Sequence, residues 1–176
     1  MNENKHTYKD RKYNVVPYDS QWPHQFELYA NKIKNIFGNT IQIEHIGSTA
    51  VPGMSGKSCI DVLVIVKNLE TVGEHLKEME QAGFEDAGQF VMKNSRLFRI
   101  MQDNSLLANI HFFPKGHPHN EEMINVRDYL RSSPNEVAAY SAMKSELYTK
   151  YSGDYAAYRK YKDEYMDALI KRAVKS

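Results

Sequence analysis

Hydrophobic residues recur along this chain with two different periods, and each change of period marks an expected element. Apolar and polar residues alternate over 40–46, which is typical of a strand with one buried face. Apolar residues dominate Cys59–Val66, which is typical of a strand buried on both faces. Three further strands are expected at 90–93, 95–102 and 106–113, separated by turns at Asn94 and Asp103-Asn104. The pattern predicts a mixed sheet of about four or five strands.

Helical spacing of apolar residues predicts two helices in the same region. The first should begin near Asp19 or Ser20, either of which can cap it, and should end at Gly38. The second is expected as one continuous helix over 69–82, ended by Gly83. Helices and strands that share one region in this way predict an α+β fold, in which the helices flank the sheet.

The last third of the chain is expected to be helical. Helices are predicted over 120–131, from Ser133 onwards, and over 153–173. Ser133 and Glu136 flank Pro134 with the spacing of a capping box, which starts the second of these helices. These helices should form a C-terminal subdomain.

Tyrosines crowd the two final helices: Tyr140, Tyr148, Tyr151, Tyr155, Tyr158, Tyr161 and Tyr165. We favour the interpretation that these rings pack the two helices together. The alternative is a surface on which nucleic-acid bases stack, because lysines and an arginine are interleaved with the rings.

Composition and charge narrow the class of protein without naming it. The chain has 176 residues, 41% of them hydrophobic, and a formal net charge of +1, which gives no overall signal for nucleic acid or a membrane. Its single cysteine excludes an internal disulfide framework and suits the reducing cytoplasm. We expect a flexible arm at 1–12, an α/β core at 13–118 and a helical subdomain packed on it at 119–176. The polar start of the chain does not resemble a signal peptide, and the composition leaves the oligomeric state open.

The loop between the first two strands has the composition of a phosphate-binding loop. Its glycines, with Ser48 and Thr49, let backbone N–H groups approach an anion, and Lys57 can neutralise negative charge. Asp61 follows near the start of the buried strand, where a carboxylate is costly unless it is paired. Asp61 is therefore the first candidate for chemistry; the alternative is that it only caps the loop by accepting N–H bonds.

The same stretch carries a family resemblance. The segments HIGSTAVPG at 45–53 and IDVLV at 60–64 resemble the GrpB family of small bacterial proteins, whose fold is similar to the polymerase-β-like nucleotidyltransferase superfamily. The superfamily motif is Gly-Ser, a spacer, and Asp-x-Asp on a strand. Gly47-Ser48 and Asp61 match this motif, whereas Leu63 occupies the place of the second carboxylate. The resemblance covers most of the chain and implies a mixed sheet of nucleotidyltransferase type with a C-terminal helical subdomain.

The resemblance also suggests a site, with Asp61 as the catalytic residue. Phosphate or nucleotide binding is expected at Gly47, Ser48, Thr49, Lys57 and Arg99. A divalent metal (magnesium, manganese or zinc) is expected at Asp61, with His111, Glu44 and His45 as further ligands. Since Leu63 cannot bind a cation, this strand does not offer the ligands of an ordinary two-magnesium site.

Three functions are compatible with these residues. The first is a nucleotidyltransferase-like enzyme that acts on a small molecule, and the second is a non-catalytic module that binds a nucleotide or phosphorylated metabolite. The third is an interaction protein that uses the Tyr-rich helices. The first two require the 47–57 loop to open into the main polar pocket with Asp61 at its base. The composite metal site further requires His111 to lie within roughly 7 Å of Asp61.

Overall fold

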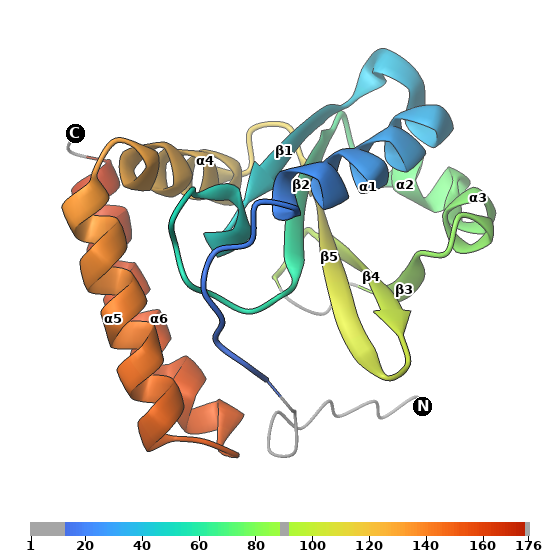
Figure 1. The fold of residues 1–176 in the computed structure, drawn as a ribbon. Coiled ribbons are helices and arrows are strands. Elements are labelled where there is room, and N and C mark those ends of the chain that lie inside the picture. Colours follow the sequence, from blue (N-terminus) through green and yellow to red (C-terminus); the bar gives the residue numbers. More distant parts are fainter. Residues whose placement is uncertain (1–12, 89–91, 175–176) are drawn as a thin grey trace.

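A computed structural model describes residues 13–88 and 92–174, which form an α+β fold built on one five-stranded sheet (Figure 1). The strand order across the sheet is β1-β2-β5-β4-β3. The strands are β1 (Gln42–Ile46), β2 (Ile60–Val66), β3 (Glu85–Gly88), β4 (Arg96–Gln102) and β5 (Ser105–Pro114). Only β2 and β5 are parallel, so the sheet is mixed, as the sequence predicts.

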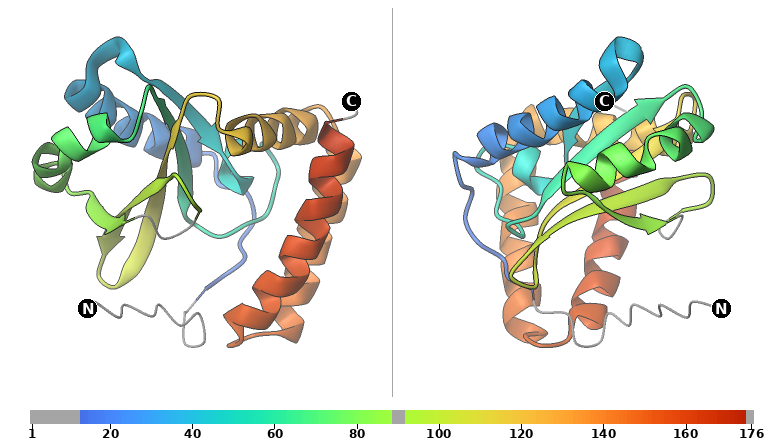
Figure 2. Two further views of the ribbon diagram at one scale, coloured as in Figure 1. Left: turned by 180° about the vertical axis from the view of Figure 1, so that it is seen from behind. Right: turned by 90° about the vertical axis from the view of Figure 1, so that its right-hand side faces the viewer.

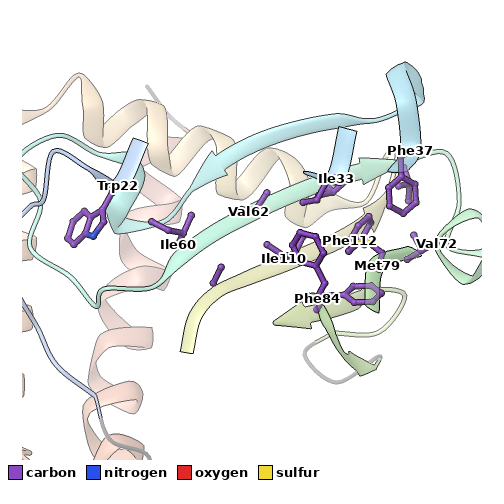
Figure 3. Packing of buried hydrophobic residues seen from close by; sticks show 14 residues of the cluster. Trp22, Ile33, Phe37, Ile60, Val62, Val72, Met79, Phe84, Ile110 and Phe112 are labelled. Atoms are coloured by element: carbon purple, nitrogen blue, oxygen red, sulfur yellow. The ribbon is translucent and has the colours of Figure 1, made fainter. Parts of the chain in front are cut away.

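One face of the sheet carries the main hydrophobic core. Val62 and Val64 of β2 and Ile110 and Phe112 of β5 point to this face and are fully buried. Helix α1 (Trp22–Phe37) covers them, and Figure 3 shows Ile33 and Phe37 of this helix beside Val62 and Phe112. Apolar residues on alternate strand positions and at helical spacing in α1 therefore bury each other, which stabilises this layer.

The opposite face of the sheet is covered by α4 (Pro118–Arg131). Leu63 of β2 is fully buried there, in contact with Ile46 and Phe113, and α4 adds Met123 to the same cluster. Asp61 lies on this face too, because residues two apart on a strand point the same way. The position of the second superfamily carboxylate is thus filled by an apolar side chain that α4 seals from water.

The helix predicted over 69–82 is wrong in one respect, because the structure has two short helices there. They are α2 (Glu70–Glu74) and α3 (Leu76–Gln81), and His75 between them leaves the helical conformation with φ −108° and ψ 17°. Gly73 lowers helix propensity just before the break. The His75 ring packs edge-on against Phe37, with 4.8 Å between ring centroids, which favours the break.

Strands β4 and β5 form the hairpin that the sequence predicts. The turn residues Asp103 and Asn104 have φ values of 49° and 61°, as a two-residue hairpin turn of right-handed twist requires. The edge strand β3 was not predicted, because Glu85 and Asp86 at its start lack the pattern of a buried strand. Of the strand expected at 90–93, the first two residues lie outside the described residues and the last two belong to a bend and turn before β4.

Two of the predicted helix caps are wrong. Helix α1 begins after Gln21, whose backbone N–H donates to Asp19 Oδ1 at 2.8 Å, so Asp19 forms a local turn before the helix. Ser133 makes no side-chain cap at α5, and Glu136 instead accepts hydrogen bonds from Tyr165 and Arg172 of the neighbouring helix, at 2.5 and 2.8 Å. Tertiary partners have taken the carboxylate that a capping box would use.

The two last helices, α5 (Pro134–Lys150) and α6 (Tyr155–Ala173), form a hairpin beside the sheet. Figure 2 shows in its right-hand view that α5 and α6 lie beyond the sheet, on the side opposite α2 and α3. Asp154 caps α6, as expected, by accepting a bond from Ala157 N at 3.0 Å. In Figure 1 the loop between β1 and β2 extends toward this hairpin.

The C-terminal tyrosines pack against one another. Tyr140 and Tyr158 are 2% and 1% exposed, Tyr140 stacks on Tyr165 with 4.9 Å between centroids, and Tyr158 meets Tyr13 at 4.8 Å. Rings that are covered in this way cannot receive a base, so the packing interpretation is the one these contacts favour. Tyr161, 40% exposed, still stacks on Tyr151.

Some expectations about organisation lie beyond these contacts. The arm expected at 1–12 is outside the described residues. The division at 118 stays a prediction: α4, which begins there, packs on the sheet through Met123 and on the hairpin as well. Among residues 13–88 and 92–174, no helix has both the length and the hydropathy to cross a bilayer.

Leu63 gives a direct test of this architecture. Replacing it with aspartate would bury a carboxylate among apolar side chains, so Leu63→Asp should lose about 3 kcal/mol or more of unfolding free energy. The volume-matched control Leu63→Met should lose less than about 1.5 kcal/mol. Urea denaturation measures both, and an aspartate variant as stable as the wild type would show that α4 does not seal this face.

Candidate functional site

The loop from Gly47 to Cys59 begins with a contact that only glycine permits. Gly47 has φ 74°, and a Cβ atom there would lie 2.9 Å from Asp61 Oδ2. Both the backbone conformation and the space exclude a side chain, so the chain passes directly over the carboxylate. Ser48 follows at once and starts the short 3-10 helix η3 (Ser48–Ala50). The Gly-Ser pair therefore brings a serine hydroxyl to the side of the sheet that holds Asp61.

Three contacts hold the loop in place. Arg131 of α4 donates from Nε to the carbonyl of Ala50 at 2.9 Å. Gly56 exchanges backbone hydrogen bonds with Val16 at 2.8 and 2.9 Å, and the N–H of Ser55 donates to Ser141 Oγ at 3.1 Å. The loop is thus fixed by the N-terminal segment, α4 and α5 together, which gives a defined shape to the part that follows η3.

Asp61 lies in a row of polar side chains on the inner strands. Its Oδ1 accepts a hydrogen bond from Asn109 Nδ2 at 3.0 Å and lies 3.6 Å from His111 Nε2. The expected proximity of Asp61 and His111 is confirmed. Burial acts to raise the pKa of this carboxyl, but His111, Asn109 and the charge of Lys57 outweigh it, so the pKa lies below its usual value. Asp61 is therefore ionised at neutral pH.

The sequence prediction missed the most buried cation of the site. Lys144 of α5 is 2% exposed, donates from Nζ to Ser48 Oγ at 2.8 Å and to the carbonyl of Ser55, and lies 4.4 Å from the centre of the Tyr140 ring. Burial, followed by the charges of Lys162 and Lys57, lowers the pKa of Lys144 to about 7. A lysine whose ammonium faces a loop hydroxyl inside the protein is well placed to meet an anion.

A signal for Lys144 is present in the sequence. Val137, Tyr140 and Lys144 are spaced three and four residues apart, so they share one face of α5, and all three are buried. A lysine on the apolar face of a helix is rarely solvated and needs a partner. Sequence alone did not indicate that its partner, Ser48, lies 96 positions away.

These residues surround a cavity of about 300 Å³ between the sheet, the loop and the C-terminal helices. Its polar wall contains Gly47, Ser48, Gly56, Lys57, Asp61, His111, His119, Glu122, Arg127, Lys144 and Lys162. The loop and Asp61 line the same cavity, as expected, but a second cavity of about 690 Å³ between β1, β2 and the start of α4 is larger. Of the four cationic side chains in this wall, Arg127 is paired with Glu44 and Asp128, and Lys162 with Asp163. Lys57 and Lys144 are therefore the cations placed to meet an anionic ligand.

The four expected metal ligands do not come together. Glu44 accepts a hydrogen bond from Arg127 Nη1 at 2.6 Å, and the same guanidinium also bonds Asp128. His45 points to the other face of the sheet, where it bonds Thr49 at 2.9 Å and stacks on Phe26. Burial, with the nearby charge of Arg131, lowers the pKa of His45 to about 4, so it is a neutral structural side chain.

Two expected phosphate-binding residues also lie apart from the cavity. Thr49 is 2% exposed and its hydroxyl is engaged by His45. Arg99 of β4 pairs with Asn109 of β5, and Asn109 in turn pairs with Asp61 of β2. Arg99 is therefore two strands away from Asp61. Within the described part of the chain, neither residue lines the cavity.

The donor set limits what metal could bind. In residues 13–88 and 92–174 no group of three histidine, cysteine, aspartate or glutamate side chains is arranged to hold an ion. Asp61 and His111 are close enough to share one cation, which would take its other ligands from water or from a phosphate. These residues do not fit a pair of metals, because Leu63 is apolar and buried.

Comparisons with known proteins concern the family and the fold of this chain. The GrpB protein family matches residues 12–172. UPF0157 protein YqkA of Bacillus subtilis is 31% identical over 169 residues, which are 96% of this chain and 49% of that protein, so this chain spans about half the length of that relative. The crystal structure of conserved protein GrpB from Enterococcus faecalis is 30% identical, with a TM-score of 0.86 over 92% of this chain and 98% of that one.

A more distant likeness concerns the fold alone. The Cid1 poly(U) polymerase with bound Mg 3'-dATP is 16% identical, with a TM-score of 0.54 over 77% of this chain and 43% of that one. The sheet and its helices therefore have the architecture of a nucleotidyltransferase. With a family match over residues 12–172 and a close structural relative, this chain belongs to the GrpB family.

Proposed function

We propose that this protein binds a phosphorylated small molecule or a nucleotide in the cavity, with a phosphate between Ser48 and Lys144. The observation that carries the proposal is the 2.8 Å contact of Lys144 Nζ with Ser48 Oγ at the cavity wall. A hydroxyl and an ammonium at the same point offer two donors to one phosphate oxygen.

The surrounding charges support this proposal. Lys57 and Lys162 line the same cavity and, after burial, are the groups that lower the pKa of Lys144. Three lysines in mutual repulsion are relieved by an anion, so part of the free energy of binding comes from removing that repulsion. Lys57 is held by a hydrogen bond to Tyr155 Oη at 2.7 Å, which limits its freedom before a ligand arrives.

Metal-dependent nucleotidyl transfer is the stronger form of the proposal. Asp61 and His111 would hold one divalent cation, which would neutralise charge on the bound phosphate. Asn109 would keep the Asp61 carboxylate oriented through its 3.0 Å hydrogen bond. The weaker form is a binding module in which Asp61 has no metal and the lysines alone hold the ligand.

Replacing Lys144 tests the proposal directly. Lys144→Met should lower the affinity for methyl phosphate about ten- to a hundredfold, because it removes a charge-assisted hydrogen bond of about 1.5–3 kcal/mol. Lys150→Met, on the exposed end of the same helix, is the matched control and should change the affinity less than about twofold. Isothermal titration calorimetry measures both, and circular dichroism checks that both variants are folded. Equal affinities in all three proteins would contradict the proposal.

The lowered pKa of Lys144 gives the binding a pH dependence. Above pH 7 the free protein must take up a proton to bind the phosphate dianion, so affinity for methyl phosphate should fall between pH 7 and 9, by up to about tenfold per unit. The unfolded chain binds more protons over this interval, so the stability of the ligand-free protein should rise with pH there. Lys144→Met should lose both trends, and calorimetry and urea denaturation at each pH provide the measurements.

Gly56 offers a test that leaves every charge in place. A Cβ atom at this position would lie 2.7 Å from Ser48 Cβ and 3.7 Å from Lys144 Nζ, so Gly56→Ala must displace the serine. We expect the affinity for methyl phosphate to fall at least about tenfold, because the contact between Ser48 and Lys144 is broken. Gly73→Ala has open space around the new methyl group and is the control, with unchanged affinity and a small gain in helix stability. If Gly56→Ala binds methyl phosphate with the affinity of the wild type, Ser48 does not take part in binding the ligand.

Asp61 distinguishes the two forms of the proposal. If one cation binds at Asp61 and His111, Mn²⁺ should strengthen the binding of methyl phosphate or ATP, and Asp61→Asn should abolish that gain. Glu122→Gln is the matched control, because Glu122 lines the same cavity but is engaged by His119 at 3.0 Å. Binding that ignores Mn²⁺ and survives Asp61→Asn would favour the module. Turnover of ATP that needs both Mn²⁺ and Asp61 would favour the enzyme.

A further inference from the structure

The cavity is lined by side chains of two kinds. Its polar lining includes Ser48, Lys57, Asp61, Lys144 and Lys162, and its apolar lining is formed by Met54, Met123, Val126, Leu130, Met166 and Ile170. A ligand that is anionic throughout would leave the apolar lining without a partner. The shape and the chemistry of the cavity therefore limit what the organic part of the ligand can be.

The apolar wall is built by regular helix faces. Met123, Val126 and Leu130 recur on α4 at spacings of three and four residues, and Met166 and Ile170 lie four apart on α6. Residues at such spacings share one side of a helix. Glu122 and Arg127 of α4 and Lys162 of α6 also line the cavity, so each helix presents apolar side chains next to polar ones. Aliphatic and thioether side chains adapt to flexible alkyl groups and offer no hydrogen bonds to a polar ring.

The aromatic rings of the cavity are already engaged. Among the described residues that line it, the tyrosines are Tyr140 and Tyr158, which are 2% and 1% exposed. One face of Tyr140 stacks on Tyr165 and its ring also receives the Lys144 ammonium, while Tyr158 packs against Tyr13. Neither ring can offer a free face to a nucleobase, which is how proteins commonly bind bases.

The size of the cavity sets a further limit. A protein cavity of about 150 Å³ can hold a benzene molecule, so the volume of about 300 Å³ corresponds to roughly ten or twelve non-hydrogen atoms. After a phosphate group is counted, the enclosed space is left for a short alkyl chain of about five to seven carbons. A nucleoside would extend well outside.

Resting on the function proposed above, we propose that the ligand is a phosphate monoester of a short aliphatic alcohol, with its chain along α4 and α6. The phosphate lies at Ser48 and Lys144, and the chain passes over Met123 and Met166 toward Ile170. Burial of the chain against apolar side chains then contributes affinity that a nucleotide cannot obtain. The free ester and a lipid phosphate in a membrane share this chemistry, and the volume of about 300 Å³ favours the free ester.

Alkyl phosphates of increasing length test the proposal. Calorimetric titrations of the wild-type protein with methyl, butyl and hexyl phosphate should show a gain of about three- to fourfold in affinity for each buried methylene. Hexyl phosphate has five more methylenes than methyl phosphate and should thus bind at least about two-hundredfold more tightly. The affinity for AMP should exceed the affinity for methyl phosphate by no more than about threefold.

A matched pair of variants assigns the effect to the apolar wall. Met166→Gln has nearly the same shape but introduces an amide beside the chain, so it should reduce the gain of hexyl over methyl phosphate at least about fivefold. Met101→Gln makes the same change at a position 38% exposed on β4, outside the cavity, and should keep the full gain. The ratio of the two ligands is read within one protein, so a general loss of stability does not imitate it.

The outcomes separate this inference from the proposed function. If methyl phosphate binds through Lys144 but chain length has no effect, or AMP binds more tightly than hexyl phosphate, the inference is overturned and the proposed function stands. If methyl phosphate and ATP both fail to bind, the proposed function is overturned and the inference with it. Recruitment to vesicles that contain phosphatidic acid, without binding of hexyl phosphate, would overturn the short free ester in favour of a lipid.

Discussion

A buried lysine joins the two parts of this protein. Lys144 extends from the first C-terminal helix into the Gly-Ser loop and meets both the Ser48 hydroxyl and the Ser55 carbonyl. An ammonium in this position has lost most of its water, so its hydrogen bonds must be good ones for the hairpin to stay against the loop. The cavity, its excess of positive charge and the shape of the loop all depend on this contact.

The sheet shows how a nucleotidyltransferase architecture accommodates the loss of one carboxylate. Leu63 does not leave a vacancy: it packs with Ile46 and Phe113 beneath α4, so this part of the sheet is an apolar core. Nearby, Asn109 and His111 of β5 lie beside Asp61 and stabilise its charged carboxylate. The replacement of the carboxylate by Leu63 agrees with the rest of the sequence, because the helix that covers Leu63 is apolar at the matching positions.

Sequence patterns accounted for the local features and for part of the site. Periodicity identified β1, β2, β4 and β5 and the long helices, and the position of Asp61 on a strand beside His111 followed from the motif. The side of a strand on which His45 lies could also be read by counting, but not that Thr49 would engage it. Glu44 was assigned to a metal because Arg127, 83 positions away, was not known to be its neighbour. Contacts between distant segments are what a single sequence leaves open.

The same long-range contacts determine when the site comes into existence. Ser48 and Lys144 are 96 positions apart, and Lys57 and Tyr155 are 98 apart. Pairings of such separation form late, because the entropy of closing long loops is lost before any contact rewards it. A chain still emerging from the ribosome could build the β1–β2 hairpin early, but the cavity would be complete only after α6 has been made. Ligand recognition is thus a property of the finished chain, and a ligand present during synthesis would stabilise only molecules that have folded to the end.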